Sequence, residues 1–395
     1  MTALGLFLGV IMLLSSLPAF VLLAEVVSAW AYRKPLILEA GDRPDLAVLI
    51  PAHNEASVLE ATIRSITPQL SAGDRLIVVA DNCTDHTAAL GRSLGAEVVE
   101  RSDEAKRGKG FALDAGIRHL SLRPPGLVAF IDADCVVAEG CLHQLAAACM
   151  HFSRPVQGTN IMRSDEGDLR NRIAEFAWRV RNVVRPSGGS ILKLPTLLMG
   201  TGMILRWEHV RLATFATSSI VEDMDLGIQL TLGGHSPVFV STPPVVSSFP
   251  THLADQVIQR TRWEHGHLGT ILQKVPRLLF AGVVLGKRSA CRLALVLIVP
   301  PLALLALIQT SQVVIAMGLW LSLGASMALP GLIALFGLGA LMIGLVSAWF
   351  QAGRDLLGIV ELLSFPRYVL GKFNVYRAFV VGRQKLWTRA RRDGE

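Results

Sequence analysis

The stretch "LVAFIDADCVV", residues 127–137, decides how the rest of the chain is interpreted. Its apolar run from Leu127 to Ile131 is typical of a strand buried in a sheet, and it ends at two carboxylates, Asp132 and Asp134. On an extended segment, side chains two residues apart point to the same side. Two converging carboxylates repel each other unless a cation such as Mg²⁺ or Mn²⁺ lies between them. The alternative is that one aspartate caps the helix that follows.

Similar apolar runs recur upstream of this stretch, and each is followed by a helical pattern. The predicted strands cover residues 45–52, 74–81, 96–101 and 126–134, and the predicted helices cover 56–69, 84–94, 109–120 and 139–151. Fully apolar strands that alternate with helices are typical of an α/β domain with a mostly parallel central sheet. Ligands bind such sheets at the carboxyl ends of the strands, where this sequence places most of its polar residues.

Two parts of the chain are too apolar for a soluble domain. The 395 residues are 51% hydrophobic and 17% charged, and residues 2–24 carry no charge. There is no Asp, Glu, Lys or Arg between Arg292 and Arg354. Because about 20 apolar residues span a bilayer, we predict about three transmembrane helices: an anchor within 1–32 and a hairpin over 293–353. A cleaved signal peptide and a third C-terminal span are the alternatives.

Basic residues predict the orientation of these spans. Arg33 and Lys34 follow the anchor, Lys287 and Arg288 precede the hairpin, and the tail 354–395 is basic. The positive-inside rule then places a domain over 45–275 on the cytoplasmic side of the membrane. We expect this membrane to be a bacterial inner membrane. The tail is expected to lie on membrane lipid, or else to be a solvated basic tail.

Composition also narrows the partners. The net charge of +7 is not gathered into a patch interleaved with aromatic residues, so no nucleic-acid partner is expected. The five cysteines form no C-x-x-C pair, which argues against a disulfide framework or a zinc site.

Five further motifs carry chemistry. "VADNCTDHT" ends a strand at Asp81, and "KRGKGFAL" places Lys109 between glycines before a helix, as in anion-binding loops. "LLMGTGMILR" puts Gly-Thr-Gly inside a predicted strand, and "IVEDMDLG" gathers acids at a helix start. In "QRTRW", residues 259–263, an amide, a guanidinium and an indole share one face of a predicted helix.

The ordered set "IPAHNE", "VADNCTD", "RGKG", "DAD", "GTG", "ED" and "QRTRW" resembles the membrane-embedded inverting glycosyltransferases of family 2. That family includes the cellulose, chitin, hyaluronan and poly-N-acetylglucosamine synthases. The matched pieces run from Pro51 to Trp263. The resemblance implies a GT-A fold, a UDP-sugar donor, and a growing polysaccharide or lipid-linked glycan as acceptor.

The resemblance also implies residue roles. Asp81 would contact the uridine, in a pocket lined by Pro51, His53 and Glu55. Lys109 would position the nucleotide. Asp132 would face the sugar or ribose and, with Asp134, the Mg²⁺ or Mn²⁺ ion that holds the diphosphate.

On the acceptor side, Asp223 would be the general base, with Glu222 beside it as a second catalytic acid. The residues implied to hold the diphosphate and the acceptor are Gly200, Thr201, Gln259, Arg262 and Trp263.

The sequence departs from the family at Asn82, where a second acid is frequent, and in having fewer spans than the large processive synthases. A transferase that adds one sugar to a lipid-linked oligosaccharide is therefore an open alternative. So is a non-catalytic scaffold of a polysaccharide export complex, and an export partner or a homo-oligomer is compatible with each.

Overall fold

The computed structural model describes residues 2–34, 43–163, 168–250 and 253–382. The polypeptide divides into two compact units. The helical unit comprises Met1–Tyr32, Asp165–Leu194 and His267–Arg383. The sheet unit comprises Arg33–Ser164 and Pro195–Gly266.

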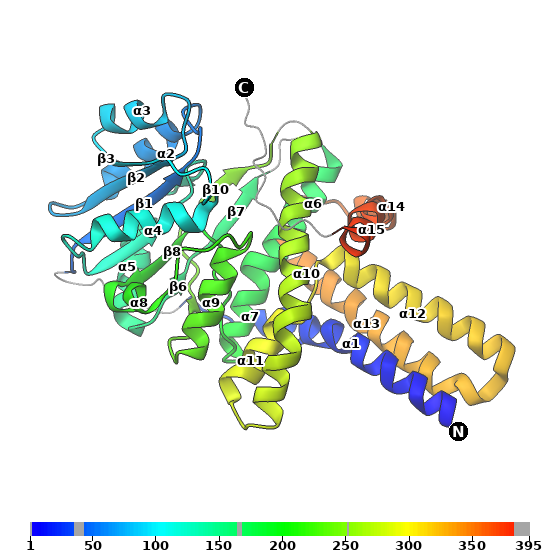
Figure 1. Ribbon diagram of the computed structural model, residues 1–395. Helices are drawn as coiled ribbons and strands as arrows, with labels where there is room; N and C mark the ends of the chain where they lie inside the picture. The colour runs from blue at the N-terminus through cyan, green and yellow to red at the C-terminus, as the bar shows by residue number, and fades with distance from the viewer. Residues whose placement is uncertain (1, 35–42, 164–167, 251–252, 383–395) are drawn as a thin grey trace. The chain divides into compact units, whose positions relative to one another are not determined.

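A seven-stranded sheet forms the centre of the sheet unit, in the order β3-β2-β1-β4-β8-β6-β9 (Figure 1). The strands are β1 (Leu46–Ala52), β2 (Arg75–Asp81), β3 (Glu97–Arg101), β4 (Leu127–Phe130), β6 (Val156–Gln157), β8 (Met203–Arg206) and β9 (Val238–Phe239). The four strands predicted from apolar runs are mutually parallel, whereas β8 pairs antiparallel with β4. The expected mostly parallel sheet is confirmed.

Helices cover both faces of this sheet, which explains why its central strands β1 and β4 are apolar throughout, whereas the edge strand β3 carries charged residues. Val48 and Ile50 of β1 pack in one buried cluster with residues of α2 and α5. Ala47 and Leu49, on the other face, pack with residues of α4 and α9. The helices are α2 (Leu59–Ile66), α3 (Thr87–Ser93), α4 (Lys109–Leu120), α5 (Cys141–Phe152), α8 (Trp207–Leu212) and α9 (Glu222–Leu232).

A smaller sheet joins β5, β10 and β7. Its strands are Val136–Val137, Val245–Ser248 and Asn160–Arg163. Short 3₁₀ segment η1 (Thr67–Gln69) follows α2, and the long helix α10 (Leu253–Val283) begins in the sheet unit and continues in the helical unit.

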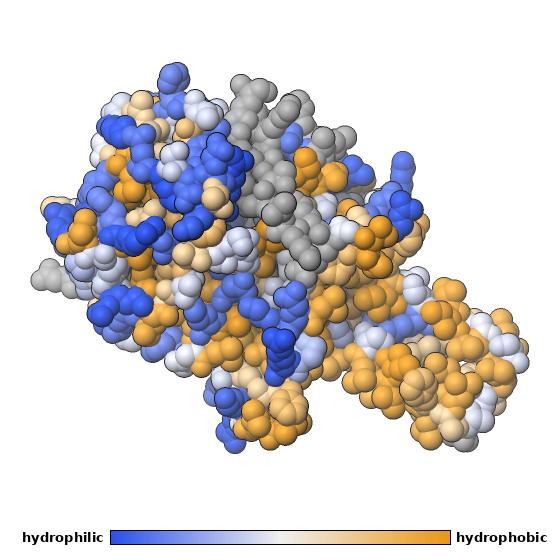
Figure 2. All heavy atoms as spheres, in the orientation of Figure 1, coloured by the Kyte–Doolittle hydropathy of each residue, from blue (hydrophilic) through white to orange (hydrophobic). Residues whose placement is uncertain are grey.

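The helical unit is built on α1, α12 and α13, which run alongside one another and expose apolar side chains (Figures 1 and 2). Its helices are α1 (Ala3–Ala29), α6 (Leu169–Arg179), η2 (Val180–Val184), α7 (Arg185–Ile191), α11 (Arg288–Leu297), α12 (Leu302–Leu323), η3 (Gly324–Met327), α13 (Ala328–Ala352), η4 (Glu361–Ser364), α14 (Phe365–Gly371) and α15 (Phe373–Val381). Two segments of the described chain, Ala3–Ala29 and Leu302–Ala352, are long and apolar enough to cross a membrane.

Polar side chains meet inside this apolar bundle. Ser16 of α1 donates through Oγ to Gln312 Oε1 of α12 at 2.9 Å, and Gln312 Nε2 donates to Ser15 Oγ at 2.6 Å. Glu25 of α1 pairs with Arg185 of α7, with 2.5 Å between the carboxylate oxygen and Nε. Hydrogen bonds between apolar helices fix which faces meet, because an unpaired polar group there is costly.

The hydrogen-bonded side chains around Ser16 pack closely against Gly337 of α13 and leave no space for a larger residue there. A Cβ at Gly337 would lie 2.3 Å from Gln309 Oε1 and 2.4 Å from Ser16 Oγ, whereas a Cβ at Gly339 meets no atom within 4 Å. We expect Gly337→Ala to destabilise the protein by about 1–3 kcal/mol through overpacking. The thermal unfolding midpoint in detergent measures this, with Gly339→Ala as the matched control. Equal midpoints for the two variants would show that the cluster does not hold α13.

Candidate active site

The two aspartates of "DAD" lie in a turn and not on an extended strand. Strand β4 ends at Phe130, Ile131 N donates to Leu49 O at 3.1 Å, and Cys135 N donates back to Asp132 O at 3.2 Å. The expectation that strand alternation points both side chains to one side is therefore wrong. The turn still follows β4, which runs parallel to its neighbour β1, so it lies at the carboxyl edge of the sheet.

A single ammonium group gathers three predicted site residues. Lys109, the first residue of α4, forms an ion pair through Nζ with Asp132 Oδ1. The same Nζ lies 3.9 Å from Glu222 Oε1 and donates to Gly200 O at 3.0 Å. Glu222 begins α9, so the amino-terminal ends of two helices meet at this cluster.

Burial and charge shift the titration of this cluster. Burial opposes the charge of Lys109, but the neighbouring Asp132 and Glu222 outweigh that effect and raise the pKa of its ammonium. Burial and the charge of Asp223 raise the pKa of Glu222 to about 7, against the opposing effect of Lys109. Lys109 therefore stays charged at neutral pH, while Glu222 is poised to hold or release a proton.

The Gly-Thr-Gly motif precedes strand β8 and is not part of it, contrary to expectation. Gly200 has a φ of +78°, and a Cβ there would lie 2.8 Å from Lys109 Nζ and 3.2 Å from Asp223 Oδ2. Its backbone thus occupies the space between the ammonium and the Asp223 carboxylate, where no side chain fits.

Thr201 and Gln157 fix the loop around that glycine. Asp132 N donates to Thr201 Oγ1 at 3.1 Å, so the motif also holds the Asp132 turn. The fully buried Gln157 donates through Nε2 to Thr201 O at 2.9 Å and accepts from Met199 N at 3.0 Å. Gln157 was not among the predicted site residues, and its position on a two-residue strand gives no sequence signal.

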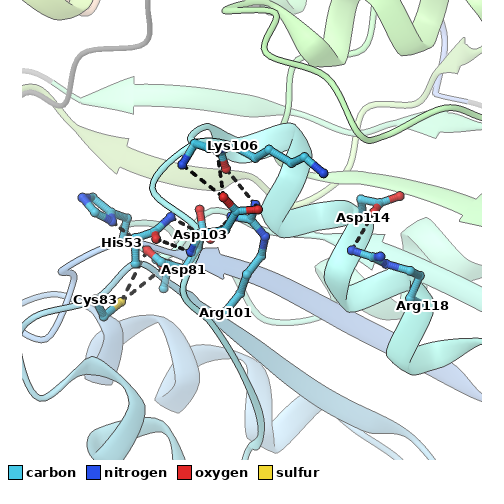
Figure 3. A network of polar contacts seen from close by, with 11 residues as sticks. His53, Asp81, Cys83, Arg101, Asp103, Lys106, Asp114 and Arg118 are labelled. Carbon is cyan, nitrogen blue, oxygen red and sulfur yellow. Dashed lines mark hydrogen bonds and ion pairs between the residues drawn. The ribbon is translucent and has the colours of Figure 1, made fainter.

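Asp81 anchors a second network, which is drawn in Figure 3. Its buried carboxylate accepts through Oδ1 from Arg101 Nη1 at 2.5 Å and from Asn82 Nδ2 at 3.1 Å. Arg101 also donates through Nη2 to Lys106 O at 2.8 Å and stacks 5.5 Å from the Phe111 ring. One guanidinium therefore joins the end of β2 to the loop that leads to Lys109.

Asn82 has its own part in this network. It has a φ of +52°, and its side-chain Oδ1 accepts from Asp103 N at 2.8 Å while its Nδ2 donates to Asp81. An acid at this position, as in many family members, has no proton to donate to Asp81 when ionised. The asparagine at position 82, where the family often has an acid, therefore takes part in the hydrogen bonds that hold this loop.

The remaining residues expected in the donor pocket border this network. Pro51 pairs with Val79 between β1 and β2. His53 donates through Nδ1 to Asp81 O at 2.7 Å, and Glu55 is buried, with its backbone N donating to Thr87 Oγ1 at 2.9 Å. The ends of β1 and β2 are therefore tied together beside Asp81.

A pocket opens at the Lys109 cluster. It is lined by Lys109, Leu113, Gly200, Met203, Thr214, Phe215, Glu222, Asp223 and Leu226. Its lining thus combines charged groups with apolar side chains, as in sites that bind small molecules.

The "QRTRW" motif lies on α10, as predicted. Gln259 is buried, and Arg262 and Trp263 are half-buried. Gly266 follows Arg262 by one helical turn, and a Cβ there would lie 2.4 Å from Val221 Cγ1. The face of α10 that carries Arg262 therefore packs next to the residue that precedes Glu222.

Two carboxylates alone are an incomplete metal site. Among the described residues, no group of three or more His, Cys, Asp or Glu side chains is arranged to hold a metal ion. Mg²⁺ commonly takes one or two protein carboxylates and fills its other positions with phosphate oxygens and water. The turn offers two carboxylates, Asp132 and Asp134, which matches that number of protein ligands.

The chain belongs to the glycosyltransferases like family 2, whose sequence model matches residues 44–266. Family and fold together define the chain as a glycosyltransferase with a GT-A fold.

Individual relatives agree with this class. The chain is 27% identical over 256 residues to probable glucomannan 4-beta-mannosyltransferase 10 of Arabidopsis thaliana, covering 61% of this chain and 46% of that protein. Over 92 residues, 22% of this chain and 24% of the relative, it is 38% identical to the 4,4'-diaponeurosporenoate glycosyltransferase of Staphylococcus aureus. The chain spans about half the length of the Arabidopsis relative and about a quarter of the Staphylococcus one.

A solved structure shares the fold. Mannosyltransferase PcManGT from Pyrobaculum calidifontis, solved with GDP-Man and Mn²⁺, superposes with a TM-score of 0.54 at 15% identity. The match covers 87% of this chain and 98% of that one.

The raised pKa of Glu222 makes stability depend on pH. Because its pKa is about 7 in the folded state and 4.5 ordinarily, the folded protein binds more protons between these values. The contribution of Glu222 to stability is then present below pH 4.5 and is lost as pH rises through 7. This amounts to about 3 kcal/mol at 1.36 kcal/mol per unit.

We expect Glu222→Gln to remove this loss of stability at rising pH. Between pH 5 and pH 8 the unfolding midpoint of the variant should therefore rise relative to that of the unsubstituted protein. The measurement is thermal unfolding in EDTA, with Glu60→Gln as the control, because Glu60 forms an exposed pair with Arg64. Parallel pH curves for both variants and the unsubstituted protein would contradict the buried-acid assignment.

Proposed function

We propose that the chain is a membrane-anchored inverting glycosyltransferase that moves a sugar from a nucleoside diphosphate sugar, a UDP-sugar by resemblance, to a growing polysaccharide or lipid-linked glycan. The observation that carries this proposal is the half-buried ammonium of Lys109, which lies among Asp132, Glu222 and Asp223 in a pocket of the family 2 glycosyltransferase domain. A cation in that place can stabilise the charge of a departing diphosphate.

The residues divide the chemistry between them. Asp81 would accept a hydrogen bond from the base, and Lys109 and Arg262 would bind the diphosphate. Asp223, which lines the pocket, would take the proton of the attacking acceptor hydroxyl. The bond from the anomeric carbon to the diphosphate breaks as the bond to the acceptor oxygen forms on the opposite face, which inverts the centre. A bound Mg²⁺ or Mn²⁺ at Asp132 and Asp134 would add charge stabilisation for the diphosphate.

The domain organisation belongs to the same proposal. An anchor within 1–32, a catalytic domain over 45–275 and a membrane hairpin over 293–353 are supported by the two apolar segments of the described chain. We infer that the protein lies in a bacterial inner membrane with its catalytic domain on the cytoplasmic side, and that the tail 354–395 lies on lipid. Residues 383–395 of that tail lie outside the described residues.

The proposal is tested by nucleotide release from the full chain in lipid. The donors are UDP-glucose, UDP-N-acetylglucosamine and GDP-mannose, each with Mg²⁺, Mn²⁺ or EDTA, and products are sized by mass spectrometry. We expect metal-dependent release with one donor. Long products indicate a processive synthase, and single additions to an added lipid-linked acceptor indicate the alternative transferase. No release with any donor by folded protein would favour the scaffold.

Asp223→Asn separates base catalysis from donor binding. We expect kcat to fall by about 10²–10⁴, as for loss of a general base, while donor affinity stays within a few-fold. Asp225→Asn is the matched control, because Asp225 lies in the same first turn of α9 but does not line the pocket. Near-normal turnover by Asp223→Asn would remove it as the base.

Arg101→Gln tests the network around Asp81. Loss of a charge-assisted hydrogen bond, about 1.5–3 kcal/mol, predicts a donor KM that rises by roughly 10–100-fold with a smaller change in kcat. Arg92→Gln is the control, since Arg92 of α3 forms an exposed ion pair with Glu100, the residue before Arg101 on β3. A fall in kcat without a change in KM would show that Arg101 acts on the reaction step and not on the donor pocket.

A further inference from the structure

Within the helical unit, the outer face of α10 is apolar and exposed. Leu272, Pro276, Phe280 and Val283 recur at helical spacing on this face, and Leu272 and Phe280 are 66% and 59% exposed. Val275 and Leu278, between them in sequence, are buried on another side of the helix. The core of the unit therefore uses one side of α10 and leaves an apolar side without protein cover.

The turn between α10 and α11 continues this surface. Val283, Val284 and Leu285 are 76%, 63% and 57% exposed. The turn is nevertheless well defined, because Val284 N donates to Phe280 O at 2.8 Å and Lys287 N donates to Ala281 O at 3.1 Å. It is a preformed apolar tip at the end of a helical hairpin.

Cations surround this tip. Arg277, Lys287, Arg288 and Arg292 are exposed, and Lys274 is half-buried one turn earlier. The sequence contains no Asp or Glu from 265 to 354. Figure 2 shows apolar and hydrophilic residues side by side at this turn, which lies below α11 in Figure 1.

Helix α11 leads from this tip to the start of α12. Helix α11 ends at Leu297, five residues before α12 starts. Leu268 of α10, Ala303 of α12 and Tyr376 of α15 form one buried cluster. Helices α14 and α15 also expose apolar side chains, including Leu370 and Val380 at 66% and 85%.

We infer that the α10–α11 tip, Phe280 to Arg288, inserts into the headgroup region of a bilayer and prefers anionic phospholipid. This inference rests on the membrane anchoring in the proposed function. An exposed apolar tip ringed by Lys and Arg is the pattern of elements that lie in the lipid interface, where the cations attract anionic headgroups.

The charge pattern argues for lipid over a second copy of the chain. Two copies that meet at this tip would bring the same cations together with no acid between Arg277 and Arg292 to balance them. An anionic bilayer supplies that balance and also covers the apolar side chains.

The test uses the full chain with an environment-sensitive fluorophore on Val284→Cys, in a background where Cys83 and Cys291 are replaced by serine. The labelled protein is placed in vesicles of phosphatidylcholine with increasing phosphatidylglycerol, and quenching by lipid-borne nitroxides is measured. Leu122→Cys is the matched control, because Leu122 is an isolated apolar residue of the sheet unit, 84% exposed.

We expect strong quenching at 284, little at 122, and quenching at 284 that grows with phosphatidylglycerol. Lys287→Glu with Arg288→Glu should reduce that growth by about tenfold, whereas Arg64→Glu with Arg118→Glu should not. A label at 284 that stays unquenched in protein that floats with vesicles overturns the inference. If quenching still increases with phosphatidylglycerol after the charge reversal, the anionic preference is overturned. If the label in detergent becomes shielded as the protein concentration rises, the tip is a contact between copies of the chain.

The same experiment distinguishes an error in the proposed function from an error in this inference. Protein that does not float with vesicles contradicts the membrane anchoring itself. Floating, quenched protein without nucleotide release contradicts the enzyme assignment and leaves the lipid contact standing.

Discussion

The ammonium of Lys109 is the constraint on which the candidate site depends. Asp132, Glu222 and Asp223 come from a strand-end turn and a distant helix, and they converge around Lys109 in a partly buried site. Without a cation their mutual repulsion in that setting would be large. Lys109 resolves it in the ligand-free protein, since it pairs with Asp132 and lies 3.9 Å from Glu222.

The scaffold holds that ammonium from several directions. A Cβ at Gly110 would lie 2.6 Å from Phe215 O, so the first turn of α4 packs directly on the backbone before α9. Arg101 fixes the loop that precedes α4, and Gln157 fixes the loop that supplies Gly200 O. The site is thus set by parts of the chain far apart in sequence, each with its own buried polar anchor.

The sequence predicts much of this arrangement, for physical reasons that can be named. Strands β1, β2 and β3 follow from apolar runs, and helix α4 was predicted with its observed bounds, because burial and periodicity are local signals. The turn at Asp132 and the loop at Gly200 were predicted as strand, because their conformation depends on partners such as Thr201 and Gln157. Arg101 gave no signal either, since an arginine at a strand end is ordinarily solvated.

The charge arrangement also explains why donor and metal should bind together. A diphosphate that enters beside Lys109 competes with Asp132 for the ammonium, and the carboxylate it displaces then needs another cation. A divalent ion bound to the diphosphate supplies that cation at the place where Asp132 and Asp134 lie. In the absence of donor, Asp132 already has Lys109 as its cation, so a free metal ion gains less by binding. The apparent affinity for metal should therefore rise with nucleotide concentration, through coupling between two ligands of one site.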